Sequence, residues 1–342
     1  MKTILIYRLG SVGDTVVALP CFHRIANFFP DTRRIVLTNH PVTSKTASLA
    51  AVLEHSGLID GTINYETRER RVGSLARIRS EIRATGADTL VYLTDPLGRG
   101  RTGVLRDLLF FIFCGIRKII GAPMAADLYN LRTDPTTGFV EYEAERLARC
   151  IQELGPINLA SQRSWDLNLT QDERQAARAA LLPLRGRKFI AVNIGGKVIE
   201  KDWGIDNWTA LLRLLWPKIP NHALAFFGAT DEQNYSATLA KIWPGASVNL
   251  CGALTPRESA AAMQSAEIFL GHDSGPMHLA ASAGTPCIAI FGNYNIPRAW
   301  HPFGNQHRII HNLTNIRAIR PEDVSAAVCD FLIKNALKKE LP

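Results

Sequence analysis

The sequence predicts an α/β protein with two domains, each built around a parallel sheet. Short apolar runs of strand length alternate with amphipathic stretches of helix length along the whole chain. At 342 residues the chain exceeds the usual size of one core, and its hydrophobic content of 46% suffices for two. We therefore expect two βαβ domains in tandem.

The first domain is expected to span residues 1–157. It opens on an apolar run that ends at Arg8, and each later strand follows a helical stretch. The expected strands are 3–8, 34–38, 61–65, 89–93 and 118–120. The expected helices lie near 14–29, 44–54, 72–84, 102–114 and 141–154.

The second domain is expected over residues 158–320. Helical periodicity stops at Gly155-Pro156, and a capping box from Thr170 to Glu173 opens the next helix. A last helix within 321–342 has no strand after it and could pack back across a cleft between the two sheets. The expected strands are 188–194, 223–227, 247–250, 267–270 and 287–291, with helices near 171–182, 207–216, 231–242, 257–264 and 276–283.

Composition narrows the class of protein. The six cysteines are scattered without C-x-x-C spacing, which favours reduced, buried thiols in a cytoplasmic protein. The N-terminal apolar run is too short for a signal peptide. The most apolar window, 105–120, contains four charged residues, so it falls short of the ~20 residues that a spanning helix needs.

The net charge of +8 is concentrated in the first domain. Between Arg68 and Lys118 the sequence carries eleven basic and five acidic residues. Such a surplus attracts nucleic acid, anionic lipid or a phosphorylated sugar, although each arginine could equally lie on a solvated helix face.

The most informative segment is 271–281, where a polar turn joins an apolar strand to a helix. Pro276 stands in the favoured first turn of that helix. The free N–H groups of the turn and the positive end of the helix dipole would face the edge where α/β sheets bind ligands, so we expect an anion there. Asp273 either caps the helix or contacts the ligand, and His278 either packs in the core or approaches it.

A second turn, from Arg8 to Asp14, joins the first strand to the first helix. It lacks the middle glycine of the dinucleotide-binding fingerprint and the acidic residue that ends a second strand, which disfavours a nicotinamide dehydrogenase. Asp14 either completes a capping box with Ser11 or acts as a general base at the sheet edge.

Two further turns follow strands of the second domain. Gly195 and Gly196 would let a ligand approach the backbone closely, and Lys197 or Lys201 could neutralise a phosphate. In the turn after Phe227, Thr230 and Glu232 either cap a helix or recognise a ribose.

Together these segments resemble glycosyltransferase family 9, the lipopolysaccharide heptosyltransferases. The resemblance rests on the opening Tyr-Arg-Leu-Gly-Ser-Val-Gly-Asp, on Glu-Lys-Asp-Trp at 200–203, on Phe-Gly-Ala at 227–229 and on Asp-Ser-Gly-Pro-Met-His-Leu-Ala-Ala at 273–281. It implies the GT-B architecture, in which two Rossmann-like domains with parallel sheets face an interdomain cleft.

The resemblance also implies site residues. It makes Asp14 the catalytic base that deprotonates the acceptor hydroxyl, and it implies no metal and no cofactor, the nucleotide sugar being a co-substrate. Implied donor-binding residues are Gly195, Gly196, Lys197, Lys201, Thr230, Glu232, Asp273, Ser274, Gly275 and His278. Candidate acceptor-binding residues are Ser11, Gly13, Arg68, Arg70, Arg71, Arg99 and Arg101.

The expected function is inverting, metal-independent transfer of a sugar from a nucleotide diphosphate donor to a lipopolysaccharide core or related glycan. The modal donor for such a family is ADP-heptose. The expected place is the cytoplasm, at the inner face of the membrane, with no nucleic acid as partner. Two alternatives stay open: a sugar-nucleotide-binding protein without catalysis, and a GT-B-like sugar-nucleotide epimerase.

Overall fold

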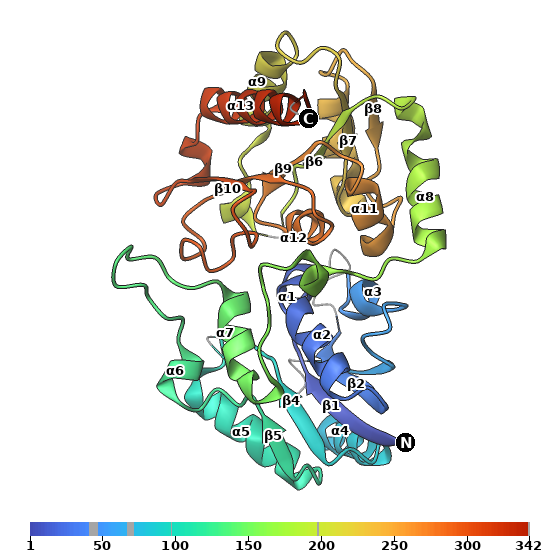
Figure 1. The fold of residues 1–342 in the computed structure, drawn as a ribbon, viewed down its shortest axis with the longest axis vertical. Helices are drawn as coiled ribbons and strands as arrows, with labels where there is room; N and C mark the ends of the chain where they lie inside the picture. Colours follow the sequence, from blue (N-terminus) through green and yellow to red (C-terminus); the bar gives the residue numbers. More distant parts are fainter. Residues whose placement is uncertain (41–46, 67–71, 97, 197, 341–342) are drawn as a thin grey trace. The chain divides into compact units, whose positions relative to one another are not determined.

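A computed structural model describes residues 1–40, 47–66, 72–96, 98–196 and 198–340 of the chain (Figure 1). They form two compact units, Met1–Asn168 and Leu169–Pro342. The division lies later than residue 157 because the segment after it stays with the first unit. The short helix η2 (Gln162–Trp165) packs on α2 (Leu19–Phe28). His23 of α2 donates to the carbonyl oxygen of Asp166 at 2.7 Å.

The described strands of the first unit form a five-stranded parallel sheet in the order β3-β2-β1-β4-β5. The chain moves outward from β1 in one direction and then in the other, so right-handed crossovers place the helices that follow β1 and β2 on one face and those that follow β3 and β4 on the other. The strands are β1 (Lys2–Tyr7), β2 (Thr32–Asn39), β3 (Gly61–Tyr65), β4 (Thr89–Tyr92) and β5 (Lys118–Ile120).

One face of this sheet is covered by α4 and α5. Alternate strand residues such as Leu5, Tyr7 and Leu37 form a core with Ile82 of α4 and Phe111 of α5. On the other face, α2 packs against α7. The helices of this unit are α1 (Val12–Val17), α2 (Leu19–Phe28), α3 (Ala50–Leu53), α4 (Val72–Ala84), α5 (Gly100–Phe113), α6 (Ala126–Tyr129), α7 (Glu143–Cys150) and η1 (Gln152–Leu154).

The described strands of the second unit form a six-stranded parallel sheet in the order β11-β10-β9-β6-β7-β8. Its strands are β6 (Phe189–Asn193), β7 (Ala223–Phe226), β8 (Ser247–Asn249), β9 (Ile268–His272), β10 (Cys287–Phe291) and β11 (Arg308–His311). Its helices are α8 (Gln171–Leu181), η3 (Leu182–Leu184), η4 (Ile199–Lys201), α9 (Ile205–Leu215), η5 (Thr230–Glu232), α10 (Gln233–Ala240), α11 (Pro256–Met263), α12 (Gly275–Ser282), η6 (Ile316–Ala318) and α13 (Pro321–Glu340).

Two cores lie on the two faces of that sheet. On one face, Val192 and Phe226 pack with Trp208 of α9 and Val324 of α13. On the other, smaller strand residues such as Ala191 meet α8, α11 and α12. Helix α13 therefore contacts α9 and β10 of its own unit.

Several elements differ from the sequence expectation. Helix α6 was not expected, and the helix expected near 141–154 is divided into α7 and η1. The helix expected over 14–29 is divided at Ala18, because Pro20 has no N–H to continue the helical ladder. The edge strand β11 was not expected, since only Ile309 and Ile310 form its apolar run. Helix α3 covers only part of the expected 44–54, of which 44–46 lie outside the described residues.

All six cysteines lie in the described part and are free thiols, and only Cys329 is partly exposed. Burial raises the pKa of the Cys21 and Cys287 thiols far above the usual range. Within the described ranges, no helix combines the length and apolarity required to cross a bilayer.

A buried ion pair joins two side chains of α7. Arg146 donates to both carboxylate oxygens of Glu143, at 2.7 and 2.5 Å, and both side chains are almost fully buried. Burial opposes the charged form of Glu143, so the pKa of this carboxyl is raised despite the arginine.

Replacing Arg146 with Met should destabilise the protein by about 3–5 kcal/mol, because it leaves the Glu143 carboxylate buried without its partner. Urea unfolding measures the loss. The control is Arg132→Met, which breaks the exposed pair with Asp127 and should leave the unfolding midpoint unchanged. Equal midpoints for the two variants would contradict this account.

His307 holds the start of β10 through a fixed tautomer. Its Nδ1 accepts from the Cys287 N–H at 3.0 Å, and its Nε2 lies 3.1 Å from the Phe303 carbonyl oxygen, so the proton belongs on Nε2. Burial lowers the pKa of this ring to about 4.

The neutral His307 ring predicts a pH dependence of stability. The unfolded chain binds a proton near pH 6.5 and the folded chain only near 4, so stability falls as the pH drops through this window, by at most about 1.4 kcal/mol per pH unit. His307→Gln removes the titrating group, so its thermal midpoint should fall less steeply with acid than that of the wild type. Parallel curves would show that His307 does not contribute.

Candidate active site

The carboxyl ends of β6, β9 and β10 lie at one edge of the second sheet, where the strands end in Asn193, His272 and Phe291. Each strand is followed by a turn that carries polar residues. In an open parallel sheet, ligands bind outside this edge.

Asn193, at the end of β6, connects the turns that follow β7 and β9. Its amide Nδ2 donates to the Phe227 carbonyl at 2.9 Å and to Glu232 Oε2 at 3.3 Å, and its Oδ1 accepts from Ser274 Oγ at 2.8 Å. The side chain is almost completely buried. It therefore fixes the positions of Ser274 and Glu232 relative to each other.

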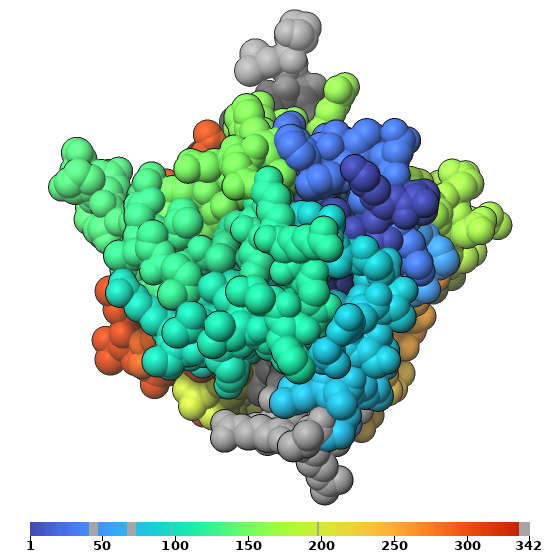
Figure 2. All heavy atoms as spheres, turned by 90° about the horizontal axis from the view of Figure 1, so that it is seen from below, coloured from blue at the N-terminus to red at the C-terminus, as the bar shows by residue number. Residues whose placement is uncertain are grey.

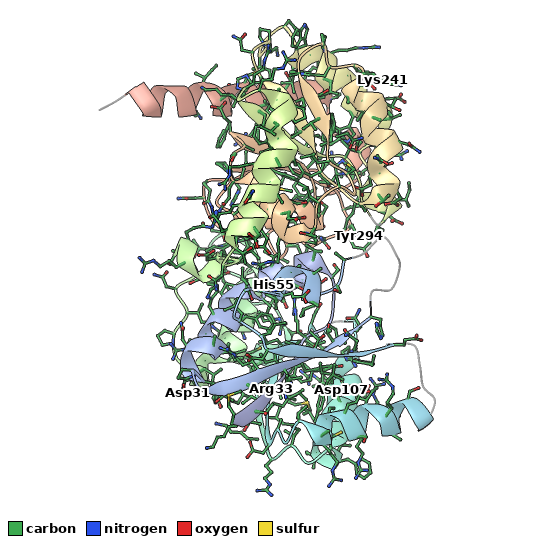
Figure 3. All side chains as sticks on the ribbon, turned by 90° about the vertical axis from the view of Figure 1, so that its right-hand side faces the viewer. Asp31, Arg33, His55, Asp107, Lys241 and Tyr294 are labelled. Carbon is green, nitrogen blue, oxygen red and sulfur yellow. The ribbon has the colours of Figure 1, made fainter. Side chains whose placement is uncertain are left out.

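Asp273 contacts or approaches three side chains of the site, Lys201, His278 and Asn295. Lys201 Nζ lies 2.6 Å from Asp273 Oδ2, His278 Nε2 lies 4.0 Å from Oδ1, and Asn295 Nδ2 donates to Oδ2. The ammonium of Lys201 also lies 4.7 Å from the centre of the Tyr294 ring, which is labelled in Figure 3. The lysine is thus held in place with its charge directed at the sheet edge.

The start of α12 supplies backbone donors beside this cluster. Ser274 is the N-cap, but its hydroxyl bonds to Asn193 rather than to the helix N–H groups. The first turn, from Gly275, therefore keeps its donors for another acceptor. His278 is buried with its ring 6.5 Å from that of Trp300, so it is both packed and close to Asp273.

The Glu232 carboxylate occupies the space that a side chain at Gly195 or Gly228 would need. A Cβ added to Gly195 would stand 1.8 Å from Glu232 Oε1, and one added to Gly228 would stand 1.9 Å from Oε2. The carboxylate also accepts from the Ala229 N–H at 3.2 Å. Glu232 is therefore compatible both with helix capping and with recognition of a ribose, since one oxygen caps η5 while the side chain stays at the sheet edge. Thr230 is exposed beside it.

In the first unit, Asp14 follows β1 in the first turn of α1. Its Oδ2 accepts from the Ser11 N–H at 2.7 Å and from Ser11 Oγ at 3.0 Å, so the capping box is present. No hydrogen bond to Oδ1 occurs among the described residues, which leaves one carboxylate oxygen for a substrate proton. Gly13 lies in the same turn.

Two groups hold this turn in place. The guanidinium of Arg8, a fully buried side chain, donates to the carbonyl oxygens of Leu93 and Asp14. Gly10, at φ +124°, has no room for a side chain, since a Cβ there would stand 2.4 Å from Asp14 Cγ.

The candidate acceptor residues that lie in the described part have different surroundings. Arg99 donates to Asp107 Oδ1 at 3.0 Å, and this buried carboxylate also accepts from Tyr92 at 3.2 Å (Asp107 is labelled in Figure 3). Arg101 is exposed at the start of α5, 5.7 Å from the Tyr129 ring centre. Four candidates lie outside the described residues: Lys197, Arg68, Arg70 and Arg71.

Sequence reasoning did not identify Asn193, Tyr294 or Asn295 as site residues. The available signal for Asn193 was a polar residue at the end of an otherwise apolar strand, two positions before Gly195. The contacts of Tyr294 and Asn295 depend on how the loop after β10 returns, which no local pattern encodes. In the part of the chain that is described, no group of three or more His, Cys, Asp or Glu residues could hold a metal ion.

Gly195→Ala should displace the Glu232 carboxylate and lower the free energy of unfolding by about 1–3 kcal/mol. Gly196→Ala is the matched control, because its Cβ would meet nothing closer than Lys201 Cβ at 3.7 Å. Urea unfolding of both variants tests the difference. A Gly195 variant as stable as the control would show that Glu232 moves away without cost.

Comparison with known proteins identifies the family. A family model described as glycosyltransferase family 9 (heptosyltransferase) matches residues 128–324. The lipopolysaccharide core heptosyltransferase OpsX of Haemophilus influenzae is 20% identical over 316 residues, which cover 90% of this chain and 84% of that protein.

Solved structures agree with the fold. A glycosyl transferase family 9 protein from Veillonella parvula superposes with a TM-score of 0.73 at 20% identity, covering 97% of this chain and 98% of that one. The E. coli ADP-heptose lps heptosyltransferase II has a TM-score of 0.69 at 17% identity, covering 98% and 100%. The expected GT-B fold with two Rossmann-like domains is therefore confirmed. Since the family model spans more than half of the sequence, the chain belongs to glycosyltransferase family 9, the heptosyltransferases.

Proposed function

We propose that this chain transfers a heptose from ADP-heptose to a lipopolysaccharide core or related lipid-linked glycan, with inversion at the anomeric carbon. Membership of the heptosyltransferase family supports sugar transfer. The relatives named for lipopolysaccharide core synthesis and for ADP-heptose support this acceptor and donor. Among the contacts of the chain itself, the pair of Lys201 with Asp273 beside the start of α12 carries the proposal.

On this proposal the donor diphosphate lies against the start of α12. Backbone N–H groups from Gly275 onward and the ammonium of Lys201 would stabilise its negative charge as the bond to the sugar breaks. Ser274 and Asp273 would position these groups, with His278 in reach of the phosphates or the sugar. Glu232 and Thr230 follow β7, two strands from β9 in the sheet, and suit the ribose hydroxyls. Gly195 and Gly196 leave room for the donor.

The acceptor hydroxyl would attack the anomeric carbon while Asp14 takes its proton. The bond between that carbon and the diphosphate oxygen breaks in the same displacement, and the nucleoside diphosphate leaves with the electron pair. A single displacement inverts the configuration. Within the described residues Oδ1 of Asp14 accepts no hydrogen bond, which supports the base role, with Ser11 and Gly13 beside the acceptor. The scheme requires neither cofactor nor metal, because Lys201 and α12 supply the positive charge.

We place the reaction in the cytoplasm at the inner face of the membrane, because a lipid-linked acceptor resides there. Arg101, exposed at the start of α5, suits acidic groups of that acceptor. Arg99 is tied to Asp107 and suits a positioning role for the loop before α5.

Asp14→Asn should reduce sugar transfer by about 10²–10⁴-fold without weakening donor binding, since the amide cannot take the proton. Lys201→Ala should instead weaken donor binding by about tenfold or more. Transfer is followed by release of ADP in the presence of acceptor, and binding by the donor-induced rise in thermal midpoint.

The matched control is Asp31→Asn, an exposed aspartate of the same unit that is labelled in Figure 3. Full activity of Asp14→Asn would remove Asp14 from the mechanism. Consumption of the donor without acceptor would favour the epimerase, and binding without any turnover would favour the non-catalytic protein. Stabilisation by UDP- or GDP-linked sugars but not by ADP compounds would overturn the proposed donor.

A further inference from the structure

Helix α5 of the first unit is apolar on both of its sides. Its inner side places Val104 and Phe111 in the core against the sheet. A surface helix ordinarily carries polar residues on its outer side. The exposed residues of α5 are instead largely apolar: Leu105, Leu109, Ile112 and Phe113 are 47%, 59%, 59% and 65% exposed.

These four residues are here called the α5 stripe. Leu109 lies four positions after Leu105, and Ile112 and Phe113 lie three and four positions after Leu109, so they form one continuous row along the helix. Phe113 lies eight positions after Leu105, or about 12 Å at the rise of an α-helix. In Figure 2, which shows this face of the first unit, the teal atoms of α5 occupy the surface with the light blue atoms of α4 beside them. Contiguous apolar surface of this kind marks a site of contact.

Basic side chains border the stripe. The guanidinium of Arg79, on α4, lies 4.2 Å from the Phe113 ring centre and donates to the Phe113 carbonyl at 3.3 Å. Arg106 is exposed within the stripe's own span, and Arg117 and Lys118 are exposed just beyond its end. Arg83 lies near enough to this end of α5 to lower the pKa of the Cys114 thiol, against the larger effect of burial.

Acidic groups offset only part of this charge. Lys118 pairs with the exposed Glu153 at 3.0 Å, and Arg106 lies 3.1 Å from Asp107. Between residues 72 and 118 the sequence has eight basic and four acidic residues. Of the acidic ones, Asp107 is buried against Arg99, and Glu81 is paired with Arg77 of its own helix at 2.6 Å. The border of the stripe is therefore positively charged, which opposes contact with a second copy of this basic chain and favours an anionic surface.

We propose that the α5 stripe inserts into the surface of an anionic lipid bilayer, with the bordering arginines and lysine on the lipid head groups. The helix is too short to cross the bilayer, so it lies in the interface with its exposed side inward. Neither the apolar row nor the basic border alone specifies a membrane, but together they have the composition of an interfacial helix. The inference deepens the proposed function, since it assigns a docking surface to an enzyme with a lipid-linked acceptor.

The direction of α5 gives the docking a geometry. In a βαβ crossover the helix runs back from the carboxyl edge of the sheet, so Arg101 lies near that edge and Phe113 lies toward the opposite one. Because the docked helix lies parallel to the bilayer, the carboxyl edge with Asp14 is displaced from Phe113 along the membrane surface by a distance comparable with the length of α5, about 20 Å. The reacting sugar of the acceptor would then be presented beside the Arg101 end of α5.

Sedimentation of the full chain with vesicles tests the docking surface directly. The wild type should co-sediment with phosphatidylcholine vesicles that contain a third of phosphatidylglycerol, and far less with phosphatidylcholine alone. The double variant Ile112→Ser/Phe113→Ser should bind the anionic vesicles about tenfold or more weakly. Arg79→Ser/Arg117→Ser should lose binding chiefly at physiological salt.

Leu182→Ser is the matched control, because Leu182 is equally exposed on the second unit. It should bind vesicles as the wild type does. All variants should keep their donor-induced thermal shift, which shows that they fold. The proposal is overturned if the wild type ignores anionic vesicles, if Ile112→Ser/Phe113→Ser binds them undiminished, or if that variant converts a dimer to a monomer, which would make the stripe a contact between copies.

The docking and the proposed reaction fail in different ways. Loss of vesicle binding with full transfer to a detergent-dispersed acceptor confirms the surface and leaves the chemistry intact. Normal vesicle binding by Asp14→Asn together with unchanged sugar transfer contradicts the catalytic proposal and leaves the surface in place.

Discussion

The second unit depends on one buried amide. Asn193 ends β6, and its side chain bonds to the turns that follow β7 and β9. A buried amide is costly unless its donors and its acceptor are satisfied, so the three turns adopt the arrangement that satisfies them together. The position of Ser274, and through it the start of α12, follows from this arrangement. The same bond keeps the Ser274 hydroxyl off the helix and leaves the first N–H groups of α12 open to an anion.

Basic side chains have different roles in the two units. In the second unit, Lys201 is held by Asp273 and Tyr294 at the edge of the sheet, where solvent and ligand can reach it. In the first unit, Arg8 is buried and Arg99 is mostly so, and each is used to hold backbone or a neighbouring helix. Exposed basic residues around α5, among them Arg106 and Arg117, instead border the apolar α5 stripe. An arginine-rich sequence therefore divides between structural supports and a charged surface.

The sequence predicted the alternation of strands and helices well, because buried parallel strands are short apolar runs and their helices carry clear caps. It placed the glycine turns and the start of α12 through the same local rules. Hydrophobic periodicity alone does not predict the break between α1 and α2 at Ala18. The signal for this break is Pro20, which lacks the N–H that a continuous helix would need. Edge strand β11 was missed because an edge strand buries too little to need a long apolar run.

Candidate site residues could be proposed from the sequence where a local pattern carries the chemistry, as at Asp14, Asp273 and Ser274. They were not predictable where the role comes from tertiary contact. The orientation of the Arg99 side chain depends on its hydrogen bond to Asp107, which lies eight residues later on the inner side of α5. The contact of Asn295 with Asp273 depends on the path of the loop after β10. The proximity of Gly195 and Gly228 to a single carboxylate is likewise a product of the fold rather than of spacing.

That crowding around Glu232 restricts the order in which the site can change during evolution. While Glu232 is present, a side chain acquired at Gly195 or Gly228 would overlap the carboxylate and would have to displace it. If Glu232 is first exchanged for a smaller residue, that overlap is removed at both glycines, and a later return to glutamate would then meet the new side chains. The order of changes at these three positions therefore matters. Side chains acquired at Gly195 and Gly228 after the loss of Glu232 would disfavour a return to glutamate.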